Sequence, residues 1–142
     1  MPQTRSRPKT ELKFQDAVLS LVAEEGCAAL GVNRIAQRAG ADKVLIYRYF
    51  GGLDGLLERV AGSREWLPSA EALVHSVNLS GADAAEVLRR ISRQLVKTIR
   101  SEPTTRQLVG WRKATRNPLT NYFTGEWRGL WRELPRVLAS GL

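Results

Sequence analysis

The segment Lys43–Phe50, with the sequence KVLIYRYF, combines cations, aliphatic side chains and tyrosines at helical spacing. The spacing predicts that Ile46, Phe50 and Tyr47 face inward. The side chains that this leaves outward are Lys43, Val44, Leu45, Arg48 and Tyr49. In a DNA major groove, cations can reach phosphates or guanine edges, and aliphatic groups can meet thymine methyl groups. The segment is therefore predicted to enter the major groove as a recognition helix.

Two preceding helices must position this segment. Apolar residues recur at helical spacing just before Gly40, namely Val32, Ile35, Ala36 and Ala39. Gly40 supplies the left-handed turn residue, and Asp42 is the predicted N-cap, because its carboxylate can accept from the amides of the first turn. A first helix is expected from about Thr10 to Glu25, ended by Gly26. Its predicted apolar stripe comprises Leu12, Phe14, Ala17, Val18, Leu21 and Val22.

The segment from Phe14 to Leu57 resembles the DNA-binding domain of tetracycline-repressor-type (TetR-type) regulators. It carries FQDAVLSLVAEEG, VNRIAQRAGADKVLIYRYF and LDGLL at the family's spacing, and it departs from the family pattern at Gly31, Asn33, Leu45 and Leu53. The resemblance implies an all-α fold, in which an N-terminal three-helix helix-turn-helix head is joined through a fourth helix to a small helical regulatory body. We expect the head at residues 1–62 and a shortened ligand-binding and dimerisation body at residues 63–142.

The recognition helix supplies most of the expected DNA contacts. Lys43, Val44 and Leu45 are candidates for base edges, and Arg48 can reach bases or backbone. The candidate phosphate contacts are Tyr47, Tyr49, Asn33 and Arg34. A basic arm of Arg5, Arg7 and Lys9 is expected to precede the first helix and to be mobile. It lies along phosphates or the minor groove in one interpretation, and is a solvated tail without function in the other.

The remaining sequence is predicted to be helical. Helices are expected over residues 53–64, 69–77, 82–101 and 103–116, with the break Trp66-Leu67-Pro68 as the junction between head and body. Ser80 and Asp83 resemble a capping box that opens the helix over 82–101. The expected buried face of that helix holds Ala84, Leu88, Ile91, Leu95 and Ile99. A last amphipathic pattern should stop or kink at Pro135. It comprises Leu119, Tyr122, Phe123, Trp127, Leu130, Trp131 and Leu134.

Candidate ligand-binding residues in the body are His75, Trp111, Trp127 and Trp131. The resemblance implies an effector cavity between the helices of the body, and aromatic residues suit an apolar pocket. Aromatic residues at helical spacing more often form a core or a subunit interface. A lone histidine is more often a partly buried structural residue than a base or ligand, so both interpretations stay open.

Catalytic and metal-binding patterns find little support. The sequence has one histidine and one cysteine, and it lacks a glycine-rich phosphate loop, a nucleophile motif and metal-ligand spacing. Cys27 is expected to be a small apolar filler rather than a reactive thiol. We expect no enzymatic activity, no cofactor and no metal. No apolar run approaches the roughly 20 residues of a membrane span, and the N-terminus lacks a signal-peptide segment, so we expect no membrane partner and a cytoplasmic location.

The formal net charge of +8 favours an anionic partner. Residues 1–60 hold nine Lys/Arg and seven Asp/Glu, whereas residues 61–142 hold thirteen and seven, so most of the excess lies outside the DNA-reading head. Two interpretations remain open. The body normally continues into more acidic sequence, or it contacts an anionic ligand or further nucleic acid.

The leading hypothesis is a bacterial transcriptional regulator, a repressor that binds a roughly palindromic operator in double-stranded DNA as a homodimer and is released by a small-molecule effector. Two alternatives stay open: a degenerate, non-specific DNA-binding module, and an interaction protein that pairs with a longer paralogue. The resembled family usually continues for another long helix, so either the interface is reduced or the chain is a truncated product.

Overall fold

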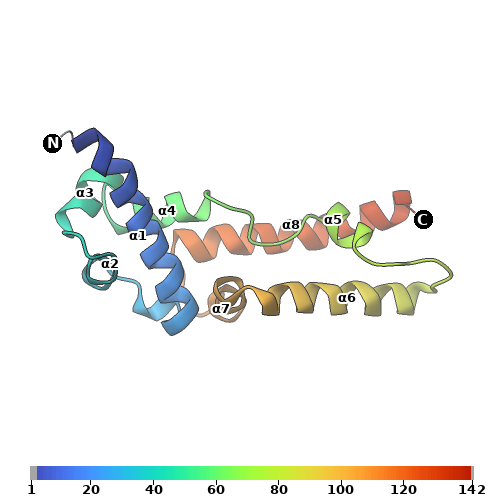
Figure 1. Cartoon of the computed structure of the whole chain (residues 1–142). Coiled ribbons are helices and arrows are strands. Elements are labelled where there is room, and N and C mark those ends of the chain that lie inside the picture. Colours follow the sequence, from blue (N-terminus) through green and yellow to red (C-terminus); the bar gives the residue numbers. More distant parts are fainter. Residues whose placement is uncertain (1–2, 142) are drawn as a thin grey trace.

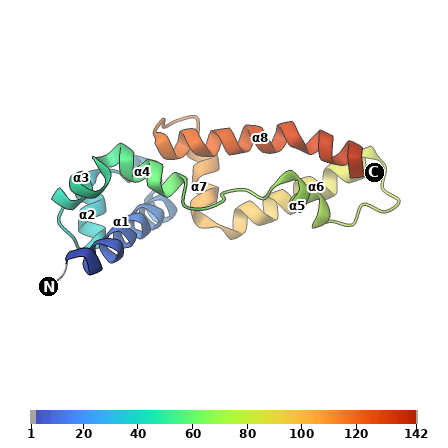
Figure 2. The same ribbon diagram turned by 90° about the horizontal axis from the view of Figure 1, so that it is seen from above.

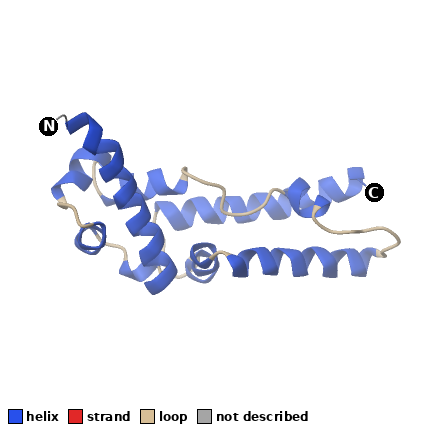
Figure 3. Ribbon diagram, in the orientation of Figure 1, coloured by secondary structure: helices blue, strands red, loops and turns tan. Residues whose placement is uncertain are grey.

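Glycines and capping residues divide the chain into three long helices and several short ones. The computed structural model describes residues 3–141 of the 142-residue chain, with side chains described for residues 7–140. The elements are α1 (Gln3–Glu25), the 3-10 helix η1 (Cys27–Ala29), α2 (Val32–Ala39), α3 (Val44–Phe50), α4 (Leu53–Ala61), α5 (Ala70–His75), α6 (Ala84–Ser101), α7 (Pro103–Trp111) and α8 (Pro118–Gly141). No strand occurs in these described residues, and the predicted all-α fold is confirmed (Figure 3).

The head comprises α1–α4 and forms one end of an elongated molecule (Figure 1). Gly26 and Gly40 make its turns with φ of +83° and +68°, in the left-handed region that glycine adopts without strain. Buried side chains from all four helices meet at its centre, including Phe14, Ile35 and Ile46. The N-cap position of α3 is Lys43 rather than the predicted Asp42, but the carboxylate of Asp42 does accept a hydrogen bond from the first turn: the backbone N–H of Val44 donates to its Oδ1 at 2.9 Å.

The body comprises α5–α8 and extends away from the head (Figures 1 and 2). The long helix α6 runs from the far end back toward the head, α8 runs from beside the head toward the far end, and the short α5 packs against both. Head and body meet where α1 and η1 contact α7 and where α4 contacts α8. The division at residues 1–62 and 63–142 stays a prediction, although the predicted break Trp66-Leu67-Pro68 does lie between helices.

The first helix begins earlier than predicted, so the expectation of a mobile arm is wrong. Arg5, Arg7 and Lys9 lie within α1, which begins at Gln3. Pro8 is the sixth residue of α1, where its missing N–H leaves the carbonyl of Thr4 without an intrahelical donor. Arg7 Nε donates to Glu11 Oε1 at 3.0 Å, one turn along the helix.

Several apolar residues expected in the core are exposed. Leu12 of α1 is 58% exposed and Leu88 of α6 is 61% exposed, and Ala84, Tyr122 and Trp131 are also exposed. Helical spacing identifies an apolar stripe, but only the part of that stripe covered by a neighbouring helix becomes core. In α6 the predicted residues Ile91 and Leu95 are buried, and the third buried residue is Val87 rather than its neighbour Leu88.

Helix ends in the body also differ from the predictions. Asp83 alone caps α6, with the backbone N–H of Glu86 donating to its Oδ1 at 2.9 Å, and Ser80 is not part of this cap. Helices α4, α5 and α7 end before the predicted positions, at Ala61, His75 and Trp111.

Helix α8 continues through Pro135 instead of stopping there. Pro135 and Trp131 are both exposed, so water can satisfy the Trp131 carbonyl that loses its intrahelical donor. None of the helices in the described residues is both long and apolar enough to cross a membrane.

Candidate nucleic-acid interface

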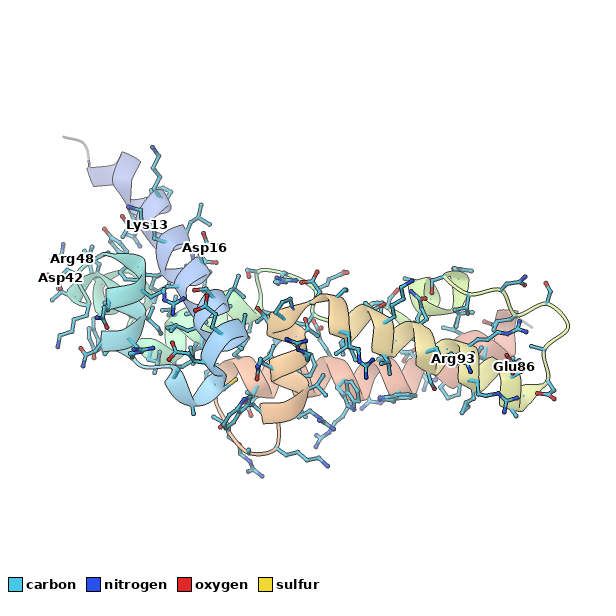
Figure 4. The ribbon with its side chains drawn as sticks, turned by 60° about the horizontal axis from the view of Figure 1, so that its bottom comes forward. Lys13, Asp16, Asp42, Arg48, Glu86 and Arg93 are labelled. Atoms are coloured by element: carbon cyan, nitrogen blue, oxygen red, sulfur yellow. The ribbon has the colours of Figure 1, made fainter. Side chains whose placement is uncertain are left out.

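Helix α3 lies at the end of the head, far from α6 (Figure 4). Its residues separate into two faces. Leu45, Ile46, Tyr49 and Phe50 are buried or half-buried and pack in the head core. Lys43, Val44, Tyr47 and Arg48 are exposed. At 3.6 residues per turn these four occupy one continuous arc of about 140°.

The exposed arc carries the chemistry that major-groove recognition requires, with two cations, one aliphatic group and one tyrosine. Val44 is 51% exposed and Tyr47 is 54% exposed, although both are hydrophobic enough to be buried elsewhere. The expectation that Tyr47 faces inward is therefore wrong. The tyrosine that turns inward is Tyr49, because only positions 45, 46, 49 and 50 lie on the side of α3 that packs on the head core.

Tyr49 joins α3 to α1. The Arg7 guanidinium lies over the Tyr49 ring, 4.7 Å from its centroid, and the Tyr49 ring meets Phe50 edge to face at 6.5 Å. Phe50 in turn meets Phe14 of α1 edge to face at 6.2 Å. These aromatic contacts fix the angle of the recognition helix on the first helix. DNA contact by Tyr49 and Leu45 stays a prediction. Both side chains are half-buried, because part of each packs against the head core.

Asn33 and Arg34 are exposed on α2. Arg34 forms an ion pair with Glu25 at the end of α1, and Arg38 pairs with Glu24 at 2.7 Å and Glu25 at 3.4 Å. Surface ion pairs of this kind contribute little free energy, so a phosphate can replace the carboxylate as the partner of Arg34. The phosphate contacts expected of Asn33 and Arg34 stay predictions.

Gly55 in α4 was not singled out from the sequence, yet it decides how closely α3 and α4 approach. A β-carbon at position 55 would overlap the carbonyl oxygen of Phe50, the last residue of α3. Glycine within a helix is otherwise unfavourable by about 1 kcal/mol relative to alanine. A glycine at the first turn after the Gly51-Gly52 loop was the available signal, because close backbone approach is a main reason to place one there.

Residues 16–60, from α1 to the end region of α4, match the model of the family described as bacterial regulatory proteins, tetR family. Through this head, the chain is similar to TetR-type transcriptional regulators. Such regulators are a class of DNA-binding proteins rather than enzymes.

Individual TetR-type relatives match over different lengths. The HTH-type transcriptional regulator BetI 1 of Chromohalobacter salexigens is 36% identical over 66 residues, which make up 46% of this chain and 33% of that protein. BetI 2 of the same organism is 40% identical over 58 residues, 41% of this chain and 28% of that protein. An uncharacterized HTH-type transcriptional regulator of Mycobacterium tuberculosis is 28% identical over 123 residues, 84% of this chain and 58% of that protein.

The chain thus spans from about three-tenths to about three-fifths of the length of these curated relatives. No solved structure matches it significantly. The BetI matches cover less than half of the chain, whereas the mycobacterial match extends over most of it.

The connection between the TetR-type head and the body is held by specific hydrogen bonds. The indole Nε1 of Trp66 donates to the carbonyl of Ala61 at 3.0 Å, and the backbone N–H of Trp66 donates to Glu126 Oε2 of α8 at 3.1 Å. Burial raises the pKa of the Glu126 carboxyl, and the backbone hydrogen bonds from Trp66 and Leu67 oppose that rise. The segment that follows α4 is thereby attached to the longest helix of the body.

The four candidate ligand-binding residues do not form one cluster. Trp127 and Trp131 of α8 meet edge to face at 6.0 Å, and Trp111 is half-buried at the end of α7. His75 is exposed at the end of α5, which corrects the interpretation of a partly buried histidine. It is not among the residues around the hollow that Trp127 lines. Ligand binding by these residues stays a prediction.

Cys27 is buried where η1 packs against the head core, as its interpretation as an apolar filler requires. Burial raises the pKa of the Cys27 thiol to about 11. The thiol is therefore protonated at neutral pH, and the thiolate, which is the nucleophile, is scarce. Among the described residues, no group of three or more His, Cys, Asp or Glu side chains could hold a metal ion.

A group of cations in the body was missed from the sequence as a site. Arg112, Lys113, Arg116 and Arg128 line one hollow of about 920 Å³ beside Trp127, where α7 turns into α8. The basic surplus of residues 61–142 was evident, and the run WRKATR at 111–116 was the local signal. The sequence did not reveal that the turn between α7 and α8 brings Arg128 of α8 to the same hollow.

Proposed function

We propose that the chain is a site-specific regulator of transcription that reads DNA with the exposed face of α3. The observation that carries the proposal is the division of α3 into a packed face and an exposed arc of Lys43, Val44, Tyr47 and Arg48. The exposed residues match the donors and apolar groups that major-groove recognition uses. Lys43 and Val44 are the candidates for base edges, and Arg48 for a base or a phosphate.

We further propose that the protein is a repressor that binds a palindromic operator as a homodimer and is released by a small-molecule effector, in the bacterial cytoplasm and on the nucleoid when bound. In a dimer, two recognition helices about 34 Å apart would enter successive major grooves. Large apolar side chains left exposed on the body, Leu88 and Val96 of α6 and Trp131 of α8, support an assembled form. Solution mass measured by light scattering tests it: a monomeric mass at micromolar concentration would contradict the dimer.

The decisive experiment compares affinities for operator and control DNA. The operator is first selected from random duplexes with the full chain, so that the result does not depend on guessing its position. Competition at physiological salt then compares the selected duplex with a scrambled duplex of equal length. We expect a preference of about a thousandfold or more. A ratio near one, with no sequence enriched by selection, would instead identify a non-specific DNA-binding module.

Arg48→Ala provides the matched variant. If Arg48 contacts a phosphate, its removal reduces the slope of log affinity against log salt concentration by about one; if it contacts guanine, specificity relaxes at one base pair. The control is Arg136→Ala, which removes the same charge from α8, in the body. If the two substitutions changed the salt slope and the specificity of DNA binding equally, the result would contradict the proposal that α3 contacts DNA.

A further inference from the structure

The hollow between the end of α7 and the start of α8, here called the α7–α8 groove, has an unusual charge. Arg112, Lys113, Arg116 and Arg128 line it, and no acidic side chain does. Its volume of about 920 Å³ lies within the range of small-molecule sites. Four like charges around one hollow repel each other and concentrate positive potential inside it, which favours an anion there.

Most of these cations have no partner within the protein. Among the described residues, Lys113, Arg116 and Arg128 form no ion pair, whereas many other arginines of the chain pair with a glutamate. Arg112 donates from Nη1 to the carbonyl of Val109 at 2.6 Å and lies over the Trp127 ring, 4.9 Å from its centroid. The indole thus fixes the Arg112 guanidinium at the wall of the groove, while the charged groups of the other three cations are available to a ligand.

The acidic and basic side chains in this part of α8 lie on different sides of the helix. Glu126 and Glu133 of α8 line a different hollow, together with Glu65. Arg128 lies on the opposite side of the helix, because residues 126 and 133 are rotated by about 160° and 140° from it. The acidic and basic side chains of α8 are therefore separated, and the acids that could neutralise the groove face away from it.

We propose that the α7–α8 groove binds a small molecule with two or more acidic groups, either phosphates or carboxylates. The binding itself is independent of the proposed reading of DNA. A small polyanion fits better than a nucleic-acid backbone because the cations line a hollow instead of a ridge. Thr124 and Asn121 at the same hollow offer polar groups beside the cations.

Calorimetric titration of the full chain tests the proposal, with pyrophosphate and citrate as separate probes at low ionic strength. We expect saturable binding of at least one probe, weakened by added sodium chloride. Binding of pyrophosphate alone assigns phosphate groups, and binding of citrate alone assigns carboxylates. Absence of saturable binding for both probes overturns the proposal.

Variants locate the site. Lys113→Ala combined with Arg128→Ala should lower the affinity by about tenfold to a hundredfold, as expected for lost charge-assisted hydrogen bonds. Arg136→Ala, which lies about two turns beyond Arg128 on α8, removes an equal charge outside the groove and should leave the affinity unchanged. Both altered positions of the double variant are exposed, so its thermal unfolding should match that of the wild type.

Two results would count against the groove. If the double variant binds the probe as tightly as the wild type, the anion sits elsewhere. If the double variant keeps its affinity for the probe but binds scrambled duplex DNA more weakly, the cations contact nucleic acid instead. Tryptophan fluorescence adds a local readout, because an anion beside Arg112 should change the emission of Trp127 and Trp127→Phe should abolish that change.

Discussion

The indole of Trp111, at the end of α7, lies against the α-carbon of Gly26, at the end of α1. A β-carbon at position 26 would come within 2.5 Å of the indole Nε1, and Gly26 has a φ of +83°. Two independent features thus require glycine there: a left-handed backbone and the close approach of a tryptophan. The contact is also part of the surface where the body holds the head.

Gly26→Ala should destabilise the protein by about 2 to 4 kcal/mol, the sum of left-handed backbone strain and overlap with Trp111. Gly40→Ala is the matched control, because Gly40 also has a left-handed φ of +68° but has open space around its α-carbon. It should cost only the backbone part, about 1 to 2 kcal/mol. Urea unfolding measures both. In a Trp111→Ala background the cost of Gly26→Ala should fall to that of Gly40→Ala; an unchanged cost would mean that the indole is irrelevant.

Gly55→Ala should disturb the head although alanine favours helices. The added β-carbon would overlap the Phe50 carbonyl and push α3 away from α4, at a net cost of about 2 kcal/mol or more. Gly125→Ala in α8 has open space and should instead stabilise the chain by up to about 1 kcal/mol. Thermal unfolding separates the two. A stabilising effect at both positions would disprove the close approach of α3 and α4.

Tyr47 and Tyr49 should respond to alanine in opposite ways. Tyr47 is exposed, so Tyr47→Ala should change the free energy of unfolding by less than about 0.5 kcal/mol while weakening DNA binding. Tyr49→Ala removes the ring under Arg7 and beside Phe50, and should cost about 2 kcal/mol of stability. Urea unfolding and DNA titration are measured on both variants. The reverse pattern would mean that α3 is rotated from the orientation described.

Cys27 gives a pH-dependent prediction. Its pKa is raised from 9.0 to about 11 by burial, so the folded state holds the thiol proton more tightly than the unfolded state. The resulting stability is fully present below pH 9.0 and is lost as the pH rises through about 11. The difference in unfolding free energy between the wild type and Cys27→Ala should therefore shrink between pH 8 and pH 11.

Alkylation gives an independent check of Cys27. Iodoacetamide should modify Cys27 slowly in the folded protein at pH 8 and rapidly in urea, as followed by mass spectrometry. Rapid modification of the folded chain would show that the Cys27 thiol is accessible to solvent, which would contradict its buried position.

The sequence predicted the head well because its signals are local. Gly26, Gly40 and Asp42 each act within one turn of a helix, so their roles follow from residue type and spacing alone. Which face of a helix is covered depends on distant elements. Tyr47 and Tyr49 are chemically equal and two positions apart, and only the placement of α1 decides that Tyr49 is the one that packs.

The body was harder to predict for the same reason. Leu88 continues the apolar row of Ile91 and Leu95 in α6, but at that end of the helix Val87 is covered and Leu88 is exposed. Likewise, the run at 111–116 is visibly basic, but its meeting with Arg128 requires the turn between α7 and α8. The helix that carries the candidate DNA contacts could thus be located from the sequence, whereas the tyrosine that it exposes and the α7–α8 groove could not.

Helix α1 touches both ends of the head. Arg7 near its start packs on Tyr49 of α3 and Phe14 at its middle packs on Phe50, while Gly26, just after its end, meets Trp111. About 28 Å of helix axis separates Arg7 from Gly26 at 1.5 Å per residue. If α1 tilted as a rigid rod by about 5° about Gly26, its Arg7 end would move by about 2.5 Å. That distance approaches the 3.4 Å step between base pairs, so under the proposed reading of DNA by α3 a small movement at the Trp111 contact would suffice to disturb the fit of α3 on its site.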